Sequence, residues 1–197
     1  YPFEQNREYV RRSINLLERS QNTFCVPETY RFLARNHLLL NQSNPARAMV
    51  EILRVVDPTR DGIENLAGIV DYVAANYGQA EQHFKEQLRI NQSQNDPPHI
   101  ESLQYLARIY EDQHRYEAAA QMHREVLKYN PGMFDSILRL AELYAVELNN
   151  PLSAKDYYQR ALQIAERYNL NNHIRRITVR LQDIQRQLNQ DLDNFNE

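Results

Sequence analysis

The chain has little glycine, cysteine or net charge, and no tryptophan. Four glycines in 197 residues disfavour β-hairpin architectures, because tight hairpin turns depend on glycine. The single cysteine, Cys25, cannot form an intramolecular disulfide, and we interpret it as a small buried hydrophobe. A net charge of −3 predicts neither nucleic acid nor a membrane surface as a partner. The composition is therefore typical of a helical protein.

Long apolar runs are also missing. None approaches the ~20 residues that cross a bilayer, so we expect no membrane span. The opening residues, Tyr1-Pro2-Phe3-Glu4, do not resemble a signal peptide. Because the chain starts with Tyr1 and not Met, we expect a trimmed piece in which missing targeting signals carry no information. We expect a soluble protein of unknown compartment, with the cytoplasm slightly favoured.

What the sequence does contain is a repeated helix-turn-helix pattern. Its clearest copy has apolar and small residues at the spacing of a 34-residue unit: Leu103, Leu106, Ala107, Tyr110, Ala119, His123, Val126 and Pro131. An earlier copy matches it without a gap at Tyr30, Leu33, Ala34, His37, Ala46, Val50, Leu53 and Pro58. Such a unit buries its apolar face only by stacking on a neighbour, so the pattern predicts a helical solenoid.

Two further copies complete the series. One is weaker and follows the stripe Ile63, Leu66, Val70, Val73 and Tyr77, and the last includes Ile137, Leu140, Ala141, Ala154, Tyr158 and Ala161. We expect repeats over about 27–60, 61–99, 100–133 and 134–168, the last with a turn that is one residue longer. Asn44-Pro45 and Asn150-Pro151 both predict an N-cap followed by the first residue of a second helix.

The pattern resembles the tetratricopeptide repeat (TPR) family, whose signature places an aromatic, a small residue, an alanine and a proline at fixed positions. The resemblance covers about residues 27–168. Here alanine replaces the family's glycine at Ala34, Ala107 and Ala141, whereas Gly68 matches it. The resemblance implies an all-α, right-handed α-solenoid of antiparallel helix pairs, the TPR superhelix.

Both ends of the repeat array are predicted to be capped. Residues 1–26 contain Tyr9, Val10, Ile14 and Leu17, which predict an N-terminal helix on the first repeat. A second stripe, Ile174, Ile177, Leu181, Ile184 and Leu188, predicts a capping helix within 169–190. Its arginines are interpreted as a solvated face in preference to a docking site. The acidic tail, 191–197, is predicted to be disordered.

No catalytic or metal-binding motif is present in the sequence. The six histidines form no H-E-x-x-H motif, and no cysteine pair supplies zinc ligands. His37 and His123 occupy core positions of their repeats. We therefore expect a protein that is not an enzyme and that has no metal and no cofactor.

In TPR proteins the first helix of each repeat lines the concave groove. Carried over by register, the resemblance implies these candidate groove residues: Arg31, Arg35, Asn65, Ile69, Tyr72, Gln104, Arg108, Leu138 and Glu142. The groove is then basic at its early end and acidic at its late end. Among the tyrosines, only Tyr72 and Tyr105 are interpreted as available to a ligand, with simple partial burial as the alternative.

The favoured function is a scaffold or adaptor module that binds a peptide or helix of a partner protein in the groove. Nucleic acid is not expected. One alternative is a structural element that self-associates through its capping helices, with a homo-oligomer possible through the C-terminal helix at Leu181 and Ile184. Another is the sensor or adaptor half of a larger regulatory, secretion or assembly protein.

Overall fold

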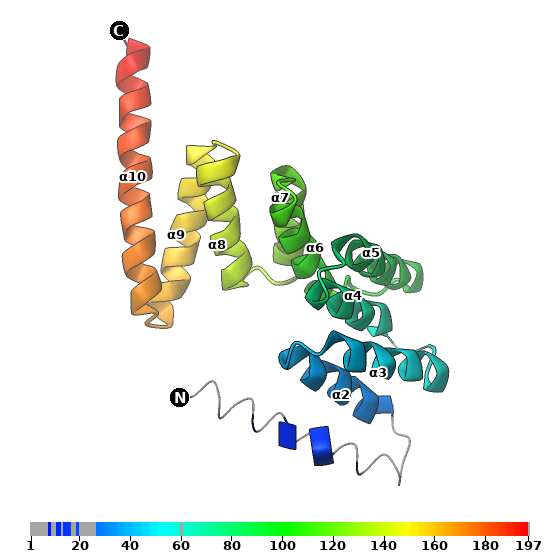
Figure 1. Cartoon of the computed structure of the whole chain (residues 1–197). Coiled ribbons are helices and arrows are strands. Elements are labelled where there is room, and N and C mark those ends of the chain that lie inside the picture. The colour runs from blue at the N-terminus through cyan, green and yellow to red at the C-terminus, as the bar shows by residue number, and fades with distance from the viewer. Residues whose placement is uncertain are drawn as a thin grey trace. The chain divides into compact units, whose positions relative to one another are not determined.

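A computed structural model describes residues 8, 11–12, 14–16, 19, 27–59 and 61–196, of which 191–196 are described by their backbone alone. Over these ranges the chain is helical and has no strand (Figure 1). It divides into two compact units, Tyr1–Tyr105 and Leu106–Glu197, with the boundary inside one helix. Cys25, Tyr9, Val10 and Leu17 lie outside the described residues.

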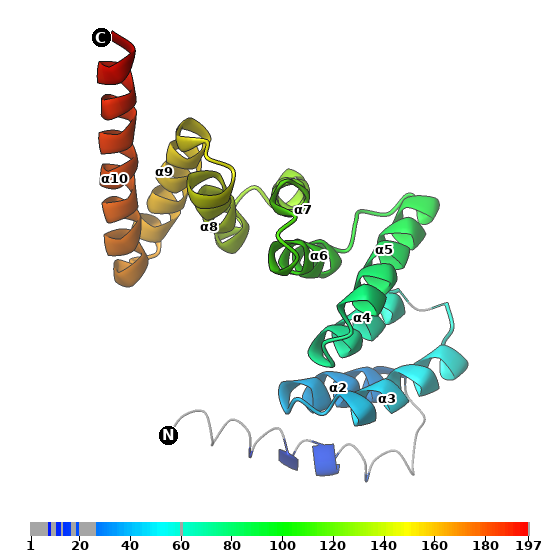
Figure 2. The same ribbon diagram turned by 45° about the horizontal axis from the view of Figure 1, so that its top comes forward.

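The first unit is built from antiparallel helix pairs. Its helices are α2 (Pro27–Leu39), α3 (Ser43–Val56), α4 (Ile63–Val73), α5 (Tyr77–Gln94) and the first residues of α6 (Ile100–Asp112). Helix α2 packs on α3 and α4 on α5, and Figure 2 shows both pairs side by side. Helix α3 also packs on α4, so the two pairs share one core. Short turns place consecutive helices antiparallel, as expected for repeats of this length.

The second unit repeats this arrangement and ends in a long helix. It contains the rest of α6, then α7 (Tyr116–Tyr129), α8 (Phe134–Glu142), a π-helical turn η1 (Leu143–Glu147), α9 (Pro151–Arg167) and α10 (Asn171–Asn196). Helix α9 packs on both α8 and α10. In both views α10 runs antiparallel to α9 and continues beyond it (Figure 1).

Small residues bring the helices of each pair close together. Ala34, Ala107 and Ala141 are all fully buried at the position where the TPR signature has glycine. Gly68 takes this position in α4, where an added Cβ would lie 2.6 Å from the Phe84 ring of α5. This distance is far shorter than van der Waals contact, so α4 and α5 approach more closely than an alanine would allow.

The turns between the two helices of each pair share one backbone conformation, a residue with positive φ. Asn41, Ala75, His114 and Asn149 each have positive φ, between 44° and 61°, directly after the first helix of a pair. In the first three turns the next amide donates to a carbonyl five residues earlier, as in Asn76 N to Asp71 O at 2.8 Å. These are the left-handed residue and the hydrogen bond of a Schellman-type helix end. Because glycine is scarce, asparagine, alanine and histidine fill these positions.

The fourth repeat has one residue more between its two helices than the other repeats. The sequence indicated that this residue lies in the turn, but the structure places it in the π-helical turn η1. The extra residue is absorbed in η1, and Asn150 N therefore donates to Tyr144 O, six residues earlier, at 2.8 Å. A single π turn accommodates an inserted residue while keeping the backbone hydrogen-bonded. Asn150 is the N-cap of α9, where its side chain accepts from Ser153 N at 3.0 Å, as predicted.

The same prediction was wrong for Asn44. Helix α3 begins at Ser43 and its N-cap is Gln42, so Asn44 and Pro45 already lie in the first turn. The side chain of Gln42 instead lies 2.9 Å from Nδ1 of His37, a buried histidine at the end of α2. This contact links the turn to α2, while Asn44 lies inside α3 and is not its N-cap.

The structure describes more residues at the C-terminal end of the repeat array than at its N-terminal end. Ile14 is buried against Leu33, Leu40 and the partly buried Met49, so at least this residue of the N-terminal segment packs on the first pair. At the other end Ile177 and Ile184 are buried, and Lys155 Nζ of α9 donates to Gln185 Oε1 of α10 at 2.8 Å. The backbone of α10 continues to Asn196, which differs from the disordered tail expected for 191–197. That segment contains no proline or glycine to end the helix.

Candidate functional site

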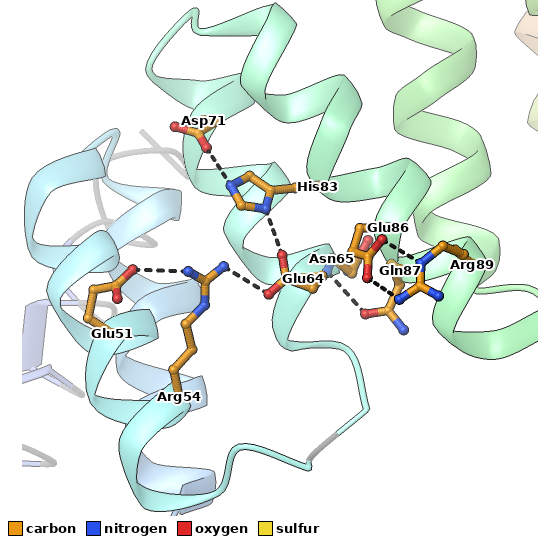
Figure 3. Close-up of polar contacts among 9 residues, drawn as sticks. All are labelled: Glu51, Arg54, Glu64, Asn65, Asp71, His83, Glu86, Gln87 and Arg89. Atoms are coloured by element: carbon orange, nitrogen blue, oxygen red, sulfur yellow. Dashed lines mark hydrogen bonds and ion pairs between the residues drawn. The ribbon is translucent and has the colours of Figure 1, made fainter. Parts of the chain in front are cut away.

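In the first unit, the predicted groove residues on α2 and α4 meet the start of α6 in one polar network. Arg35 and Asn65 both donate to Oε2 of Glu101, at 2.9 and 2.8 Å. The hydroxyl of Ser102 donates to Oδ1 of Asn65 at 2.8 Å. The backbone amide of Asn65 donates to Oε1 of Gln87 at 3.3 Å (Figure 3). The network therefore links helices that belong to three successive repeats.

Burial changes what two of the predicted residues can do. Asn65 is fully buried and Ile69 is 5% exposed, so their side chains have little surface for a ligand. The hydrogen bonds that Asn65 makes to Gln87, Glu101 and Ser102 are all internal, which makes it a structural tie between α4 and α6. Arg31, Tyr72 and Gln104 remain partly exposed. Their role in a groove stays a prediction.

Tyr72 and Tyr105 lie in an aromatic cluster of the first unit. Their ring centroids are 5.0 Å apart, edge to face. Tyr72 also meets Tyr77 at 5.5 Å, while Tyr105 stacks on buried Phe84 at 5.2 Å. Such pairs stabilise packing in addition to the area that they bury. Both tyrosines remain partly exposed beside this cluster.

His99, just before α6, is a titratable group whose surroundings favour the neutral form. Burial lowers the pKa of its imidazole, and the nearby Arg31 and Arg35 lower it further, while Asp61 and Glu101 oppose the change. Among the described residues, its buried Nδ1 has no hydrogen-bond partner. His99 is therefore a neutral ring at the edge of the Arg35–Glu101 network.

A second polar cluster joins α3, α4 and α5 (Figure 3). The ring of His83 lies between two carboxylates, with Nδ1 2.7 Å from Glu64 and Nε2 3.3 Å from Asp71. Arg54 of α3 approaches Glu64 at 2.9 Å, and Arg47 approaches Asp71 at 2.6 Å. The hydrogen bond from His83 is the main cause that lowers the pKa of Glu64.

This charge cluster borders a polar cavity of about 240 Å³ and was not predicted from the sequence. Asp71 is 1% exposed, so its charge depends on Arg47 for compensation. The only signal in the sequence is that Glu64 and Asp71 lie seven residues apart, on one face of a helix. Nothing in the sequence indicates that His83 and two arginines of the preceding pair meet that face. Every charged group of the cluster already has a partner within it, so we interpret it as a tie between repeats.

In the second unit, Leu138 and Glu142 line a cavity of about 350 Å³. Both residues belong to the predicted groove set. The remaining lining comes from α9 and from the capping helix: Tyr158, His173, Arg175, Arg176, Ile177, Val179 and Arg180. The cavity thus has an apolar part and a strongly basic wall contributed by α10.

The basic wall reverses the expected charge of this part of the surface. The residues of the first helices alone predicted an acidic late end of the groove. Glu142 is paired with Arg139 at 3.2 Å and lies 3.9 Å from Arg176. Among the described side chains, Arg175 and Arg180 have no carboxylate at ion-pair distance. The wall therefore carries cationic charge that no described carboxylate neutralises.

Tyr158 and His173 complete the lining of the cavity. Burial raises the pKa of the Tyr158 phenol, as does Glu142, while Arg180 and Arg176 oppose the change. Tyr158 is 2% exposed and remains a neutral phenol. The His173 ring packs edge to face on Phe134 of α8, with centroids 5.2 Å apart.

The other predicted surface residues lie elsewhere. Arg108 is exposed on α6 and does not line this cavity. Ile184, offered for self-association, is 5% exposed and Leu181 is partly buried, which places this stripe inward. Within the described ranges, no helix is long and apolar enough to cross a membrane. Among the described residues, no group of three or more His, Cys, Asp or Glu side chains is placed so that it could hold a metal ion.

Comparison with known proteins identifies the fold. No protein family and no curated protein matches the sequence. In structure, the chain is similar to TTC0263, a TPR protein of Thermus thermophilus, with 20% identity, a TM-score of 0.63 and coverage of 85% of this chain and 88% of that one. It is also similar to MamA, with 16% identity, a TM-score of 0.63 and coverage of 81% and 88%. YrrB, a TPR protein with an unusual peptide-binding site, has 14% identity, a TM-score of 0.59 and coverage of 86% and 84%. The fold is therefore of the all-α, TPR type.

Proposed function

We propose that this protein is a protein-interaction module that binds a segment of a partner on the face formed by the first helices of its repeats. The observation that carries the proposal is the cavity of the second unit, which is lined by Leu138 and Glu142, two residues of the predicted groove. YrrB, which has the same type of fold, is described as having a peptide-binding site, and this likeness supports the proposal.

The size and lining of the cavity fit a side-chain anchor. Ligand pockets typically measure ~300–1,000 Å³, so a cavity of about 350 Å³ takes one or two large side chains and not a whole helix. Burial of one aliphatic or aromatic side chain contributes about 1.5–3 kcal/mol. A few such anchors supply most of the binding energy in protein interfaces.

We propose that the first unit contributes further contacts through Arg31, Arg35, Tyr72 and Gln104, and that Arg108 adds another. Arg35 is the least direct of these, because Glu101 already occupies one side of its guanidinium group. Reversal of its charge would disturb this ion pair as well as any ligand. The cavity of the second unit is therefore the sharper place to test the proposal.

The test is selection of binding peptides from a displayed random library against the whole chain, followed by affinity measurement on variants. Val179→Glu places a charge at the cavity lining, and we expect it to weaken the selected peptides about tenfold or more. Val55→Glu is the matched control, since Val55 is 82% exposed on α3. If both variants bind equally well, or if no peptide is selected, the proposed site is wrong. Circular dichroism of both variants confirms that the fold is retained.

A further inference from the structure

The cavity of the second unit has a surplus of positive charge. Its wall contains three arginines against a single carboxylate, Glu142. That carboxylate is already shared between Arg139 and Arg176, so it does not neutralise the other two arginines of the wall. Arg175 and Arg180 then have no acidic partner among the described side chains. Arginine stays charged at any physiological pH, so this surplus is permanent.

We infer that the segment taken by this cavity is acidic, with one aliphatic or aromatic side chain flanked by carboxylates. The inference rests on the proposed function and names the chemistry of the partner. Leu138, Ile177 and Val179 supply the apolar contact for the central side chain. Arg175 and Arg180 supply charge-assisted hydrogen bonds for the flanking carboxylates, which arginine can hold in a bidentate geometry.

The spacing of these groups along α10 supports a flanked arrangement. Arg180 lies five positions after Arg175, which is about 7.5 Å along a helix axis. Val179, 55% exposed, lies between them in sequence and beside the cavity. Carboxylates on both sides of an apolar residue can therefore reach an arginine while the apolar side chain enters the cavity.

Other occupants fit these observations less well. A basic segment would oppose the two unpaired arginines with like charge. Nucleic acid would satisfy the arginines, but it has no counterpart for the apolar part of the cavity, and the chain as a whole has a net charge of −3. A second copy of the chain could offer residues 191–197, whose sequence DLDNFNE has acidic and apolar residues. The favoured occupant is therefore an acidic segment of another protein, and the experiment distinguishes it from nucleic acid and from a second copy of the chain.

The experiment compares two labelled twelve-residue peptides by fluorescence anisotropy on the full chain. One has the core Asp-Glu-Leu-Phe-Glu-Asp, and its matched partner has Asn-Gln-Leu-Phe-Gln-Asn. We expect the acidic peptide to bind at least about tenfold more tightly, and to weaken several-fold as salt rises from about 0.05 to 0.5 M and screens the charges. Arg175→Glu combined with Arg180→Glu should abolish this preference. Arg186→Glu, on the same helix but outside the cavity lining, should keep it.

Each alternative outcome has a distinct meaning. Equal binding of the two peptides overturns the acidic chemistry but leaves the proposed function intact, because Val179→Glu would still weaken both. If neither peptide binds, and library selection also fails, both the inference and the proposed function fall. Light scattering that shows a concentration-dependent dimer, lost in the double arginine variant, would identify a second copy as the occupant and overturn the inference. Tighter binding of a single-stranded RNA oligonucleotide than of the acidic peptide would identify nucleic acid, and it too would overturn the inference.

Discussion

The close approach of α4 and α5 at Gly68 gives a sharp test of how the second repeat is packed. A Cβ added at Gly68 would lie 2.6, 2.8 and 2.9 Å from three carbons of the Phe84 ring. Ordinary contacts of this kind begin at about 3.4 Å, so the ring or the helix must move by several tenths of an ångström. Phe84 is fully buried and stacks on Tyr105 at 5.2 Å, which leaves the ring little room.

Two opposing effects set the size of the change in Gly68→Ala. Overpacking of a tight core costs about 1–3 kcal/mol. Alanine is about 1 kcal/mol more favourable than glycine inside a helix, which offsets part of that cost. We therefore expect Gly68→Ala to lower the free energy of unfolding by up to about 2 kcal/mol. The measurement is urea unfolding followed by circular dichroism, with the midpoint and slope compared with those of the parent chain.

Gly78 offers the matched control, because it lies near the start of α5 and a Cβ there meets nothing within 4 Å. Gly78→Ala should be neutral or stabilising by up to about 1 kcal/mol. If Gly68→Ala proved as stable as Gly78→Ala, the close packing of Phe84 against α4 would be refuted. Phe84→Leu in the Gly68→Ala background relieves the overlap, so a double-mutant cycle should show coupling between the two positions.

Three further predictions concern the turns and the polar network. Ala75→Gly should raise the free energy of unfolding by about 0.5–1 kcal/mol, because Ala75 has a φ of 61°, which glycine adopts without strain. Ala74→Gly, at a φ of −79°, should lower it. Equal urea midpoints for the two variants would contradict this prediction. Asn65→Ala should cost about 2–3 kcal/mol in the same assay, since it leaves buried polar partners unpaired, while Gln104→Ala should stay within about 0.5 kcal/mol. His99 should titrate by proton NMR below the ordinary value of about 6.5, because burial disfavours its charged form. Because the pKa of His99 is lowered in the folded state, its neutral ring favours folding at pH values above about 6.5, and this contribution is lost as the pH falls. If the free energy of unfolding of His99→Gln fell with decreasing pH in the same way as that of the parent chain, the lowered pKa of His99 would be contradicted.

The repeats could be predicted from the sequence because their signal is local. Ala34, Ala107 and Ala141 recur at one position of the pattern, and all three are fully buried. The cap at Asn150 was predicted correctly for the same reason, since its bond to Ser153 spans only three residues. The identical dipeptide at Asn44 was misjudged, because α3 begins one residue earlier, at Ser43, and has Gln42 as its N-cap.

The candidate sites depended more on packing than on pattern. The register placed Asn65 in the groove, but its side chain turns inward to Glu101 and Ser102. The contact of His83 with Glu64 and Asp71 requires α4 and α5 to pack in one particular register. A repeat pattern specifies which face of a helix is apolar, but it does not specify which polar residues at the edge of that face contact one another.

The sequence by itself determined an all-helical chain of paired repeats, because periodic apolar residues, small contact residues and turn residues act over short distances. It also indicated Leu138 and Glu142 as surface candidates. Only the tertiary structure decided that α10 brings Arg175, Arg176 and Arg180 to those residues and encloses a cavity with them. The physical reason is that a cavity and its charge arise from side chains of three helices, and their juxtaposition is set by packing and not by any one segment.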